Sequence, residues 1–144
     1  MTTVKITVSG LAETEKRMED IASGAWKRGL LAIVGGLVQR QTVTRIRSEK
    51  TAPSGAAWAG WAKSTARRKR KGDGLMVETG RLMGSISASV AGDTAVIGTN
   101  VFYGAFHQEG TPKMLARPFL GLSKANEDEV TGAAERFIAA RLAV

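Results

Sequence analysis

The side chain best suited to acid–base chemistry is His107, the only histidine in the chain. Tyr103, Gln108 and Glu109 lie near it in the sequence, and residues of these types can transfer protons when they converge in a pocket. The sequence contains no phosphate-binding glycine loop, HExxH pair, nucleophile elbow or calcium-loop spacing. A histidine beside Phe106 is more simply explained as a packed residue with a hydrogen bond. We therefore predict no catalytic residues and a protein that is not an enzyme.

Metal binding has equally weak support, and no cofactor is indicated. The chain has no cysteine, which excludes disulfides, thiolate ligands and a cysteine nucleophile. A lone histidine without a spaced carboxylate partner seldom forms a metal site. We predict neither a metal nor a cofactor.

The basic run is a more informative feature than the histidine. It consists of five consecutive cations, Arg67, Arg68, Lys69, Arg70 and Lys71. The formal net charge is +8, and removing these five leaves +3, so most of the excess is local. The run is either a solvated, mobile arm or an electrostatic contact with DNA or with an acidic partner surface.

Trp58 and Trp61 lie three residues apart, shortly before the basic run. Tryptophans among cations can stack on the bases of single-stranded nucleic acid. The same pair could instead anchor the loop on the core or fill a pocket of a neighbouring subunit, because tryptophan is enriched in interface hot spots. We favour an anchor or an interface over base stacking.

The amino-terminal half predicts a strand followed by a long helix. Residues 3–8 alternate apolar and polar side chains, as a half-buried strand does. Apolar or small residues then recur at helical spacing over residues 11–48. Gly24 and the pair Gly35-Gly36 are weak points of this helix. They either kink it or permit close approach of a neighbouring element, and we expect a kink near residues 23 and 24.

The carboxy-terminal half predicts a hairpin between loops. Residues 51–74 read as a long loop. Residues 85–90 and 94–98 are expected to form a β-hairpin turning at Gly92-Asp93. Residues 101–107 suggest one short helical turn, 108–116 a further loop, and a final helix starts near Ser123 with acidic residues in its first turn. The predicted class is α+β, with residues 1–144 forming a single domain.

Neither export nor membrane insertion is predicted from the sequence. The amino terminus lacks an apolar stretch after a basic one. The longest apolar stretch, near residues 30–38, is broken by Gly35 and Gly36 and is shorter than the roughly 20 residues that span a bilayer. We expect a soluble protein without a membrane partner.

Three segments carry a resemblance to a known family. They are residues 80–86 (GRLMGSI), 97–110 (IGTNVFYGAFHQEG) and 116–123 (ARPFLGLS), and the similarity extends upstream to the tryptophan loop. Together they resemble the phage virion morphogenesis family, the tail-completion proteins of Mu-like and related tailed phages. The residues that carry this signature are Gly80, Leu82, Ile86, Gly98, Asn100, Tyr103, His107, Gln108, Arg117, Pro118, Phe119 and Leu120.

The resemblance implies an α+β virion protein that acts late in tail assembly. Such a subunit is expected to form a ring, with six copies, around the DNA channel at the tail end or in the neck. Its expected partners are other copies of itself, the tail-tube protein, head-completion or neck proteins and, without specificity, the packaged DNA. It would be assembled in the host cytoplasm.

Two sets of residues have different expected roles in this ring. Trp58, Trp61 and the basic run are predicted to become ordered at a subunit or tail-tube interface. Phe119 and Leu120 are predicted to pin the final helix to the sheet, with Arg117 pairing a nearby carboxylate or carbonyl. The alternative function is a DNA-binding accessory protein that uses the basic, tryptophan-containing loop.

Overall fold

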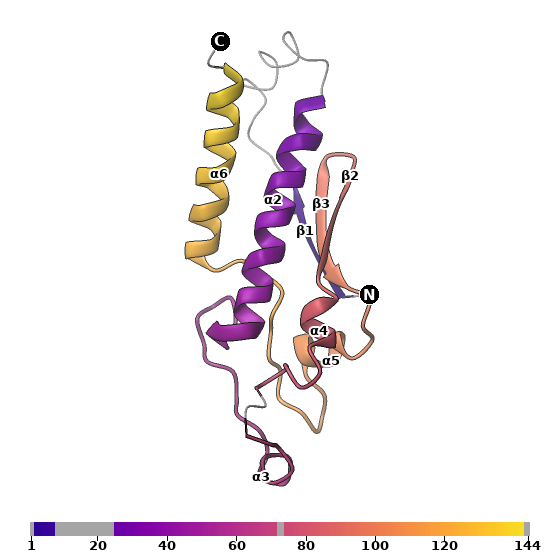
Figure 1. The fold of residues 1–144 in the computed structure, drawn as a ribbon. Helices are drawn as coiled ribbons and strands as arrows, with labels where there is room; N and C mark the ends of the chain where they lie inside the picture. The colour runs from indigo at the N-terminus through magenta and orange to yellow at the C-terminus, as the bar shows by residue number, and fades with distance from the viewer. Residues whose placement is uncertain (1, 8–24, 72–73, 143–144) are drawn as a thin grey trace.

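Helix α6, helix α2 and a β-sheet form three successive layers (Figure 1). The structure is a computed structural model, and it describes residues 2–7, 25–71 and 74–142. Helix α2 spans Ala25–Thr44 and continues into a π-helical turn, η1, at Arg45–Glu49. Helix α6 spans Lys124–Leu142 and packs along α2 on the side away from the sheet. Helix α2 is therefore the central layer.

The sheet is antiparallel and has the strand order β1-β3-β2. Strand β1 spans Thr2–Thr7, β2 spans Ser87–Ala91 and β3 spans Thr94–Thr99. The hairpin turn at Gly92-Asp93 joins β2 to β3, as predicted. The first strand also matches the prediction to within one residue at each end.

Only one face of the sheet packs on the helices. Val4, Ile97 and Ala88 are paired across the three strands, and all three belong to the hydrophobic core or pack against it. On the other face, Lys5 and Ser89 are exposed on either side of Val96. This alternation is the period of two expected for a half-buried sheet.

Helix α2 runs without interruption through Gly35 and Gly36. A side chain at Gly35 would begin 3.5 Å from Cβ of Ala88 and 3.6 Å from Cβ of Ala95, so this glycine lies where the helix crosses the sheet. Of the two alternatives for these glycines, close approach of a neighbouring element therefore applies to Gly35, and the neighbouring element is the sheet. The predicted kink at residues 23–24 and the predicted helix over 11–24 lie outside the described residues.

Helix α6 begins with a reciprocal cap. The backbone N–H of Asn126 donates to Oγ of Ser123, and the backbone N–H of Ser123 donates to Oδ1 of Asn126. This is the arrangement of a capping box with asparagine at the third position. The cap confirms the predicted helix start near Ser123.

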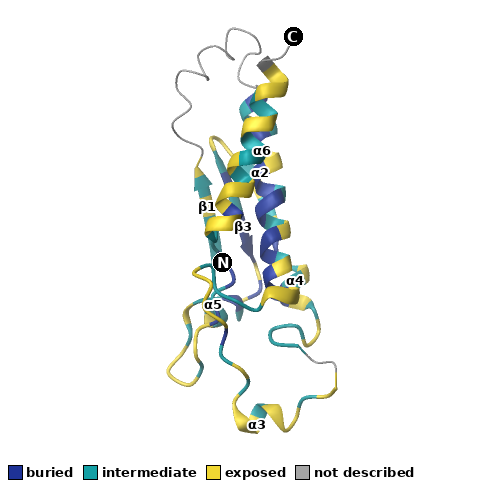
Figure 2. Ribbon diagram, turned by 90° about the vertical axis from the view of Figure 1, so that its left-hand side faces the viewer, coloured by how far each residue is buried: buried dark blue, intermediate teal, exposed yellow. Residues whose placement is uncertain are grey.

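The remaining elements gather at one end of the molecule, which we call the loop end (Figure 1). They are three short helices, α3 at Lys63–Ala66, α4 at Arg81–Gly84 and α5 at Gly104–Glu109. Much of this end is exposed (Figure 2). The whole is the predicted α+β fold.

Two boundaries at the loop end were predicted incorrectly. Residues 85 and 86 were assigned to a strand, but helix α4 ends there and Oγ of Ser85 donates to the carbonyl of Leu82. The short helix expected at 101–107 begins only at Gly104, because the N–H of Val101 is held by Oγ1 of Thr99. Among the described helices, none is long and apolar enough to cross a membrane.

Candidate assembly surface

Residues 117–121 form an extended segment that takes no part in the described sheet, so its backbone needs other hydrogen-bond partners. Gln108 supplies several of them. Its Oε1 accepts the N–H groups of Phe119 and Leu120 at 3.1 and 3.0 Å, and its Nε2 donates to the carbonyl of Leu120. The N–H of Arg117 donates to the carbonyl of His107. Helix α5 therefore holds this segment through its own backbone and one side chain.

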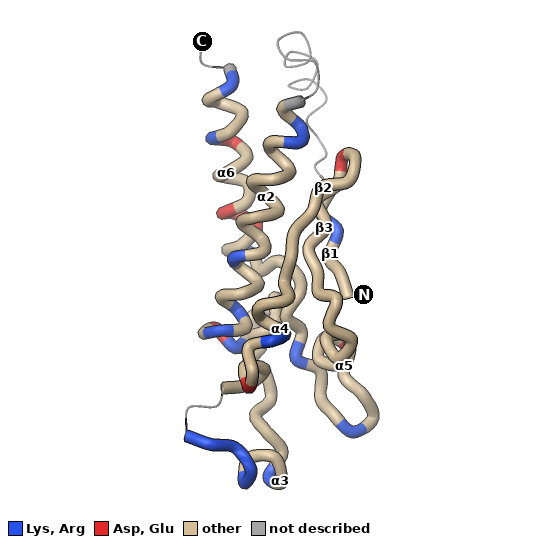
Figure 3. Tube along the Cα trace, turned by 45° about the vertical axis from the view of Figure 1, so that its right-hand side comes forward, with Lys and Arg blue, Asp and Glu red and all other residues tan. Residues whose placement is uncertain are grey.

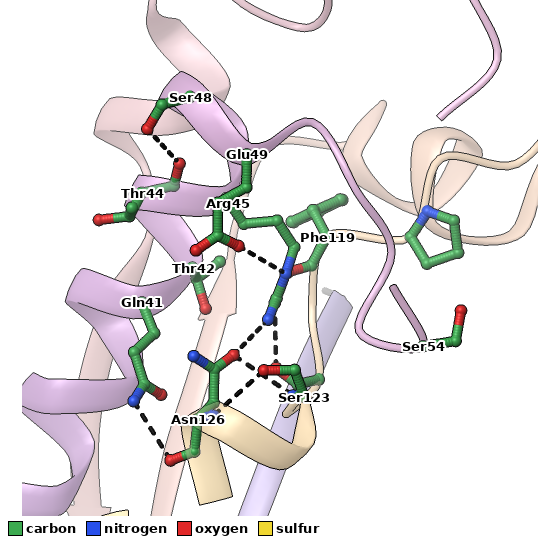
Figure 4. Close-up of polar contacts among 12 residues, drawn as sticks. Gln41, Thr42, Thr44, Arg45, Ser48, Glu49, Ser54, Phe119, Ser123 and Asn126 are labelled. Carbon is green, nitrogen blue, oxygen red and sulfur yellow. Dashed lines mark hydrogen bonds and ion pairs between the residues drawn. The ribbon is translucent and has the colours of Figure 1, made fainter. Parts of the chain in front are cut away.

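Arg45 also donates hydrogen bonds to this segment (Figure 4). Its Nη1 donates to the carbonyls of Phe119 and Gly121 at 2.8 and 3.0 Å, and its Nη2 donates to Oδ1 of Asn126. The side chain is 1% exposed, and burial lowers its pKa while Glu49, 4.0 Å away, partly offsets the effect. One guanidinium thus ties η1, the 117–121 segment and the cap of α6 together.

Phe119 and Leu120 occupy the core, as predicted, and are 0% and 4% exposed. The carbonyl pairing predicted for Arg117 is also present. Its Nε and Nη2 donate to the carbonyls of Ala59 and Gly60, each at 2.8 Å. Residues 117–121 therefore contribute side chains to the core and also hold the tryptophan loop by hydrogen bonds.

Trp58 lies inside the fold, with 7% of its surface exposed, and its Nε1 donates to the carbonyl of Pro118 at 2.8 Å. Of the alternatives for this residue, anchoring of the loop on the core describes its position in the single chain. A side chain buried in this way offers little surface to a partner, so the interface prediction for the loop rests on Trp61 and the basic run. That prediction remains a proposal.

The other signature residues have mostly structural positions. Leu82 and Ile86 are buried in the core. Gly80 has a φ of 75°, which favours glycine, and a side chain at Gly98 would lie 2.5 Å from the carbonyl oxygen of Thr2. Asn100 is exposed.

Residues 59–71, which we call the arm, extend from this anchor (Figure 3). Lys69 pairs with Glu78, which lies outside the arm, at 2.8 Å. Its ammonium also lies 5.4 Å from the ring centre of Trp61, within the arm. The rest of the basic run is exposed, namely Arg67, Arg68, Arg70 and Lys71. The run is thus divided between one inward cation and four outward ones.

A cleft of about 820 Å³ separates the arm from the loop that follows α5. Trp61 lines it from the arm, Arg81 from α4, His107 from α5, and Lys113 and Leu115 from that loop. Outside the cleft, two aromatic rings, one on α5 and one just before it, are also exposed. Phe102 is 74% and Phe106 is 47% exposed, and their ring centres lie 6.3 Å apart.

The residues around His107 do not converge on a reaction centre. Gln108 is engaged by the 117–121 backbone and Glu109 is exposed. Burial, and then the charge of Arg117, lower the pKa of His107 below 6.5. Its ring meets Tyr103 edge-on, but Nδ1 is buried without the predicted hydrogen bond. Within the described residues, no three histidine or acidic side chains are grouped to hold a metal ion.

Sequence reasoning missed the role of Arg45. The buried face of the helix is marked by Val34, Val38 and Ile46. Arg45 lies seven residues after Val38, which is two helical turns, and is therefore on that same face. A charged residue within an apolar helical stripe was the available signal, because burying a charge requires partners. The buried polar residues Gln41 and Asn126 were also missed.

Comparisons with known proteins identify the family of the chain. Residues 14–139 match the model of the phage virion morphogenesis family. The chain is 32% identical over 131 residues to the Mu-like prophage FluMu G protein 1 of Haemophilus influenzae, covering 88% of this chain and 87% of the relative. It is 26% identical over 137 residues to the putative capsid assembly protein G of Escherichia phage Mu, covering 87% and 88%. No solved structure matches the chain. The chain therefore belongs to the phage virion morphogenesis family, and its role in the bacteriophage is structural or in assembly.

Proposed function

We propose that this protein is a ring subunit at the head–tail junction of a tailed phage, acting in tail completion or in the neck without catalysing a reaction. The family and the relative named as a putative capsid assembly protein support an assembly role. The ring would surround the DNA channel, where exposed cations would face the phosphates of the DNA.

The observation that carries this proposal is the exposed aromatic pair, Phe102 and Phe106, at the loop end. Large aromatic side chains dominate protein interfaces because each buries much apolar surface. The pair gives the loop end an apolar surface, unlike the exposed Lys5 and Ser89 on the open face of the sheet. A head-to-tail ring requires two such different patches on each subunit.

The outward cations of the arm support a place beside DNA. Arg67, Arg68 and Lys71 are exposed and flank one another along the chain. Their attraction to phosphate needs no base sequence, as packaged DNA would demand. The partners we propose are other copies of the chain, six in a ring, together with the tail-tube protein and a head-completion or neck protein.

The same cations favour the second candidate function, a DNA-binding accessory protein. Such a protein would hold DNA as a monomer or dimer, with an affinity that falls steeply as salt rises. A ring subunit would bind free DNA weakly and without specificity. The assembly state in solution therefore separates the two functions.

The test is the mass of the purified protein by light scattering, alone and after mixing with tail-tube protein of the same phage. We expect a ring in one of these conditions, and we expect Phe102→Ser with Phe106→Ser to abolish it. Ile33→Ser is the matched control, because Ile33 is 45% exposed but lies on α2. A stable monomer that ignores tubes and binds DNA would favour the accessory function.

A further inference from the structure

The cleft beside the arm has an excess of positive charge. Among the described residues that line it, the charged ones are Lys69, Glu78, Arg81, Lys113 and Arg117. Lys69 already neutralises Glu78, which supplies the one carboxylate of this described set. The cleft therefore attracts negative charge.

Two of these cations remain available to a ligand. Arg117 directs its guanidinium to the carbonyls of Ala59 and Gly60. Arg81 and Lys113, by contrast, are exposed, and their side chains have no hydrogen bond or ion pair to the described residues. They lie on different walls, one on α4 and the other on the loop after α5. A ligand with spaced negative charges can engage both.

The cleft also has an apolar lining that a simple anion would leave unused. Leu75, Met76 and Met114 are half-buried there, and Leu115 is 70% exposed. Methionine side chains are flexible and adapt to varied apolar partners. The ligand that fits is amphipathic, with both carboxylates and apolar side chains.

We infer that this cleft receives an extended acidic segment of a partner protein, whose carboxylates meet Arg81 and Lys113 and whose apolar side chains pack against the methionines and Leu115. The inference rests on the proposed function, in which neighbouring virion proteins supply the segment. A volume of about 820 Å³ suits a short peptide.

Nucleic acid fits this cleft less well than an acidic peptide. DNA would supply the negative charge, but its phosphate backbone has no aliphatic side chains for the apolar lining. Base stacking on Trp61 is restricted because the ammonium of Lys69 lies 5.4 Å from the ring centre. The outward cations of the arm, rather than the cleft, are the surface suited to phosphate.

Trp61 provides a built-in reporter for the test. It lines the cleft, whereas Trp26 and Trp58 are buried in the core at 1% and 7% exposure. The isolated full chain is titrated with an eight-residue peptide that alternates glutamate and leucine, and with the same peptide carrying lysine for glutamate. The indole N–H signals in NMR spectra are followed. We expect the acidic peptide to bind saturably, with the largest signal shift at Trp61, and the lysine peptide not to bind.

Charge reversal on the cleft walls tests the contacts. Arg81→Glu with Lys113→Glu is expected to weaken acidic-peptide binding by about tenfold or more, whereas Arg67→Glu with Arg68→Glu on the outward arm changes it by less than about twofold. Equal losses in the two double variants, or equal binding of the lysine peptide, would overturn the inference.

Two further outcomes would also count against it. Displacement of the peptide by a thymidine oligonucleotide of similar length, with the same shift at Trp61, would assign the cleft to nucleic acid. Absence of saturable peptide binding would reject the cleft as a peptide site. If rings still form in either case, the proposed function stands. Peptide binding by a chain that never forms rings would count against the proposed function alone.

Discussion

Hydrogen bonds of Arg117 join the 117–121 segment to the arm, but the two regions differ in how the rest of the chain holds them. The backbone of 117–121 is held by Gln108, Trp58 and Arg45, all from other parts of the chain. The arm is fastened by Arg117 at its start and by Lys69 near its end, and most of its cations face outward. The first region derives its structure from the single chain. The second exposes most of its cations to solvent.

The two regions therefore have different roles. Residues 117–121 stabilise the fold, whereas the arm keeps exposed groups that can bind a partner. Buried polar groups without partners cost free energy, so the 117–121 segment needs every hydrogen bond that surrounds it. Exposed cations cost nothing of this kind, because water solvates them. Mutations in the two regions are therefore expected to differ in kind: the first unfolds the protein, and the second affects its partners.

The largest expected effect comes from Phe119→Ala. Phe119 is fully buried, and removing its ring leaves a cavity in the core, which costs about 3–5 kcal/mol of the free energy of unfolding. Urea denaturation followed by circular dichroism measures the change. Phe102→Ala is the matched control, since that ring is 74% exposed. Equal stability of Phe119→Ala and the parent would refute the core assignment.

Arg45→Met is expected to have the next largest effect and to lower the free energy of unfolding by about 3 kcal/mol. The substitution retains much of the side-chain length but leaves the carbonyls of Phe119 and Gly121 and the amide oxygen of Asn126 without their donor. Arg47→Met, on the exposed side of the same turn, serves as the control in the same urea experiment. Similar losses in both variants would contradict the special role of Arg45.

A smaller effect is expected from pH through His107. The folded protein holds the pKa of His107 below 6.5, so in mild acid the unfolded chain binds a proton that the folded chain resists. The free energy of unfolding therefore falls as the pH drops below this value. Urea midpoints between about pH 7.5 and 5.5 are expected to fall more in the parent than in His107→Asn. An equal decline in both proteins would mean that other groups cause it.

The smallest effect on stability is expected from Arg67→Ser, Arg68→Ser and Lys71→Ser combined. These side chains are exposed, so the free energy of unfolding changes by no more than about 0.5 kcal/mol. Retention of the protein on a DNA column is expected to decrease and to become less sensitive to salt. A triple variant that is strongly destabilised would show that the arm, like the 117–121 segment, supports the fold.

Several elements were predictable because their signals are local. Alternation in residues 3–8 and around Gly92-Asp93 identified the strands and their turn, and the acidic first turn identified the start of α6. Helix α4 was not predicted, and α5 begins after the start of the predicted turn and runs into the predicted loop. The residues beside these two helices include Ser85 and Thr99, whose hydroxyls meet each other at 2.5 Å. That contact forms only when the two segments are packed together.

The α+β class, the three strands, the two long helices, the charge of the arm and the family signature could be predicted, because periodicity, composition and motifs are properties of neighbouring residues. The contacts that those residues make depend on the tertiary fold. It buried Trp58, turned Lys69 inward, and made Arg45 the partner of carbonyls more than 70 positions away in the chain. The physical reason is that a buried donor or charge takes its partners from whatever segments the fold brings beside it, and sequence spacing does not contain that information.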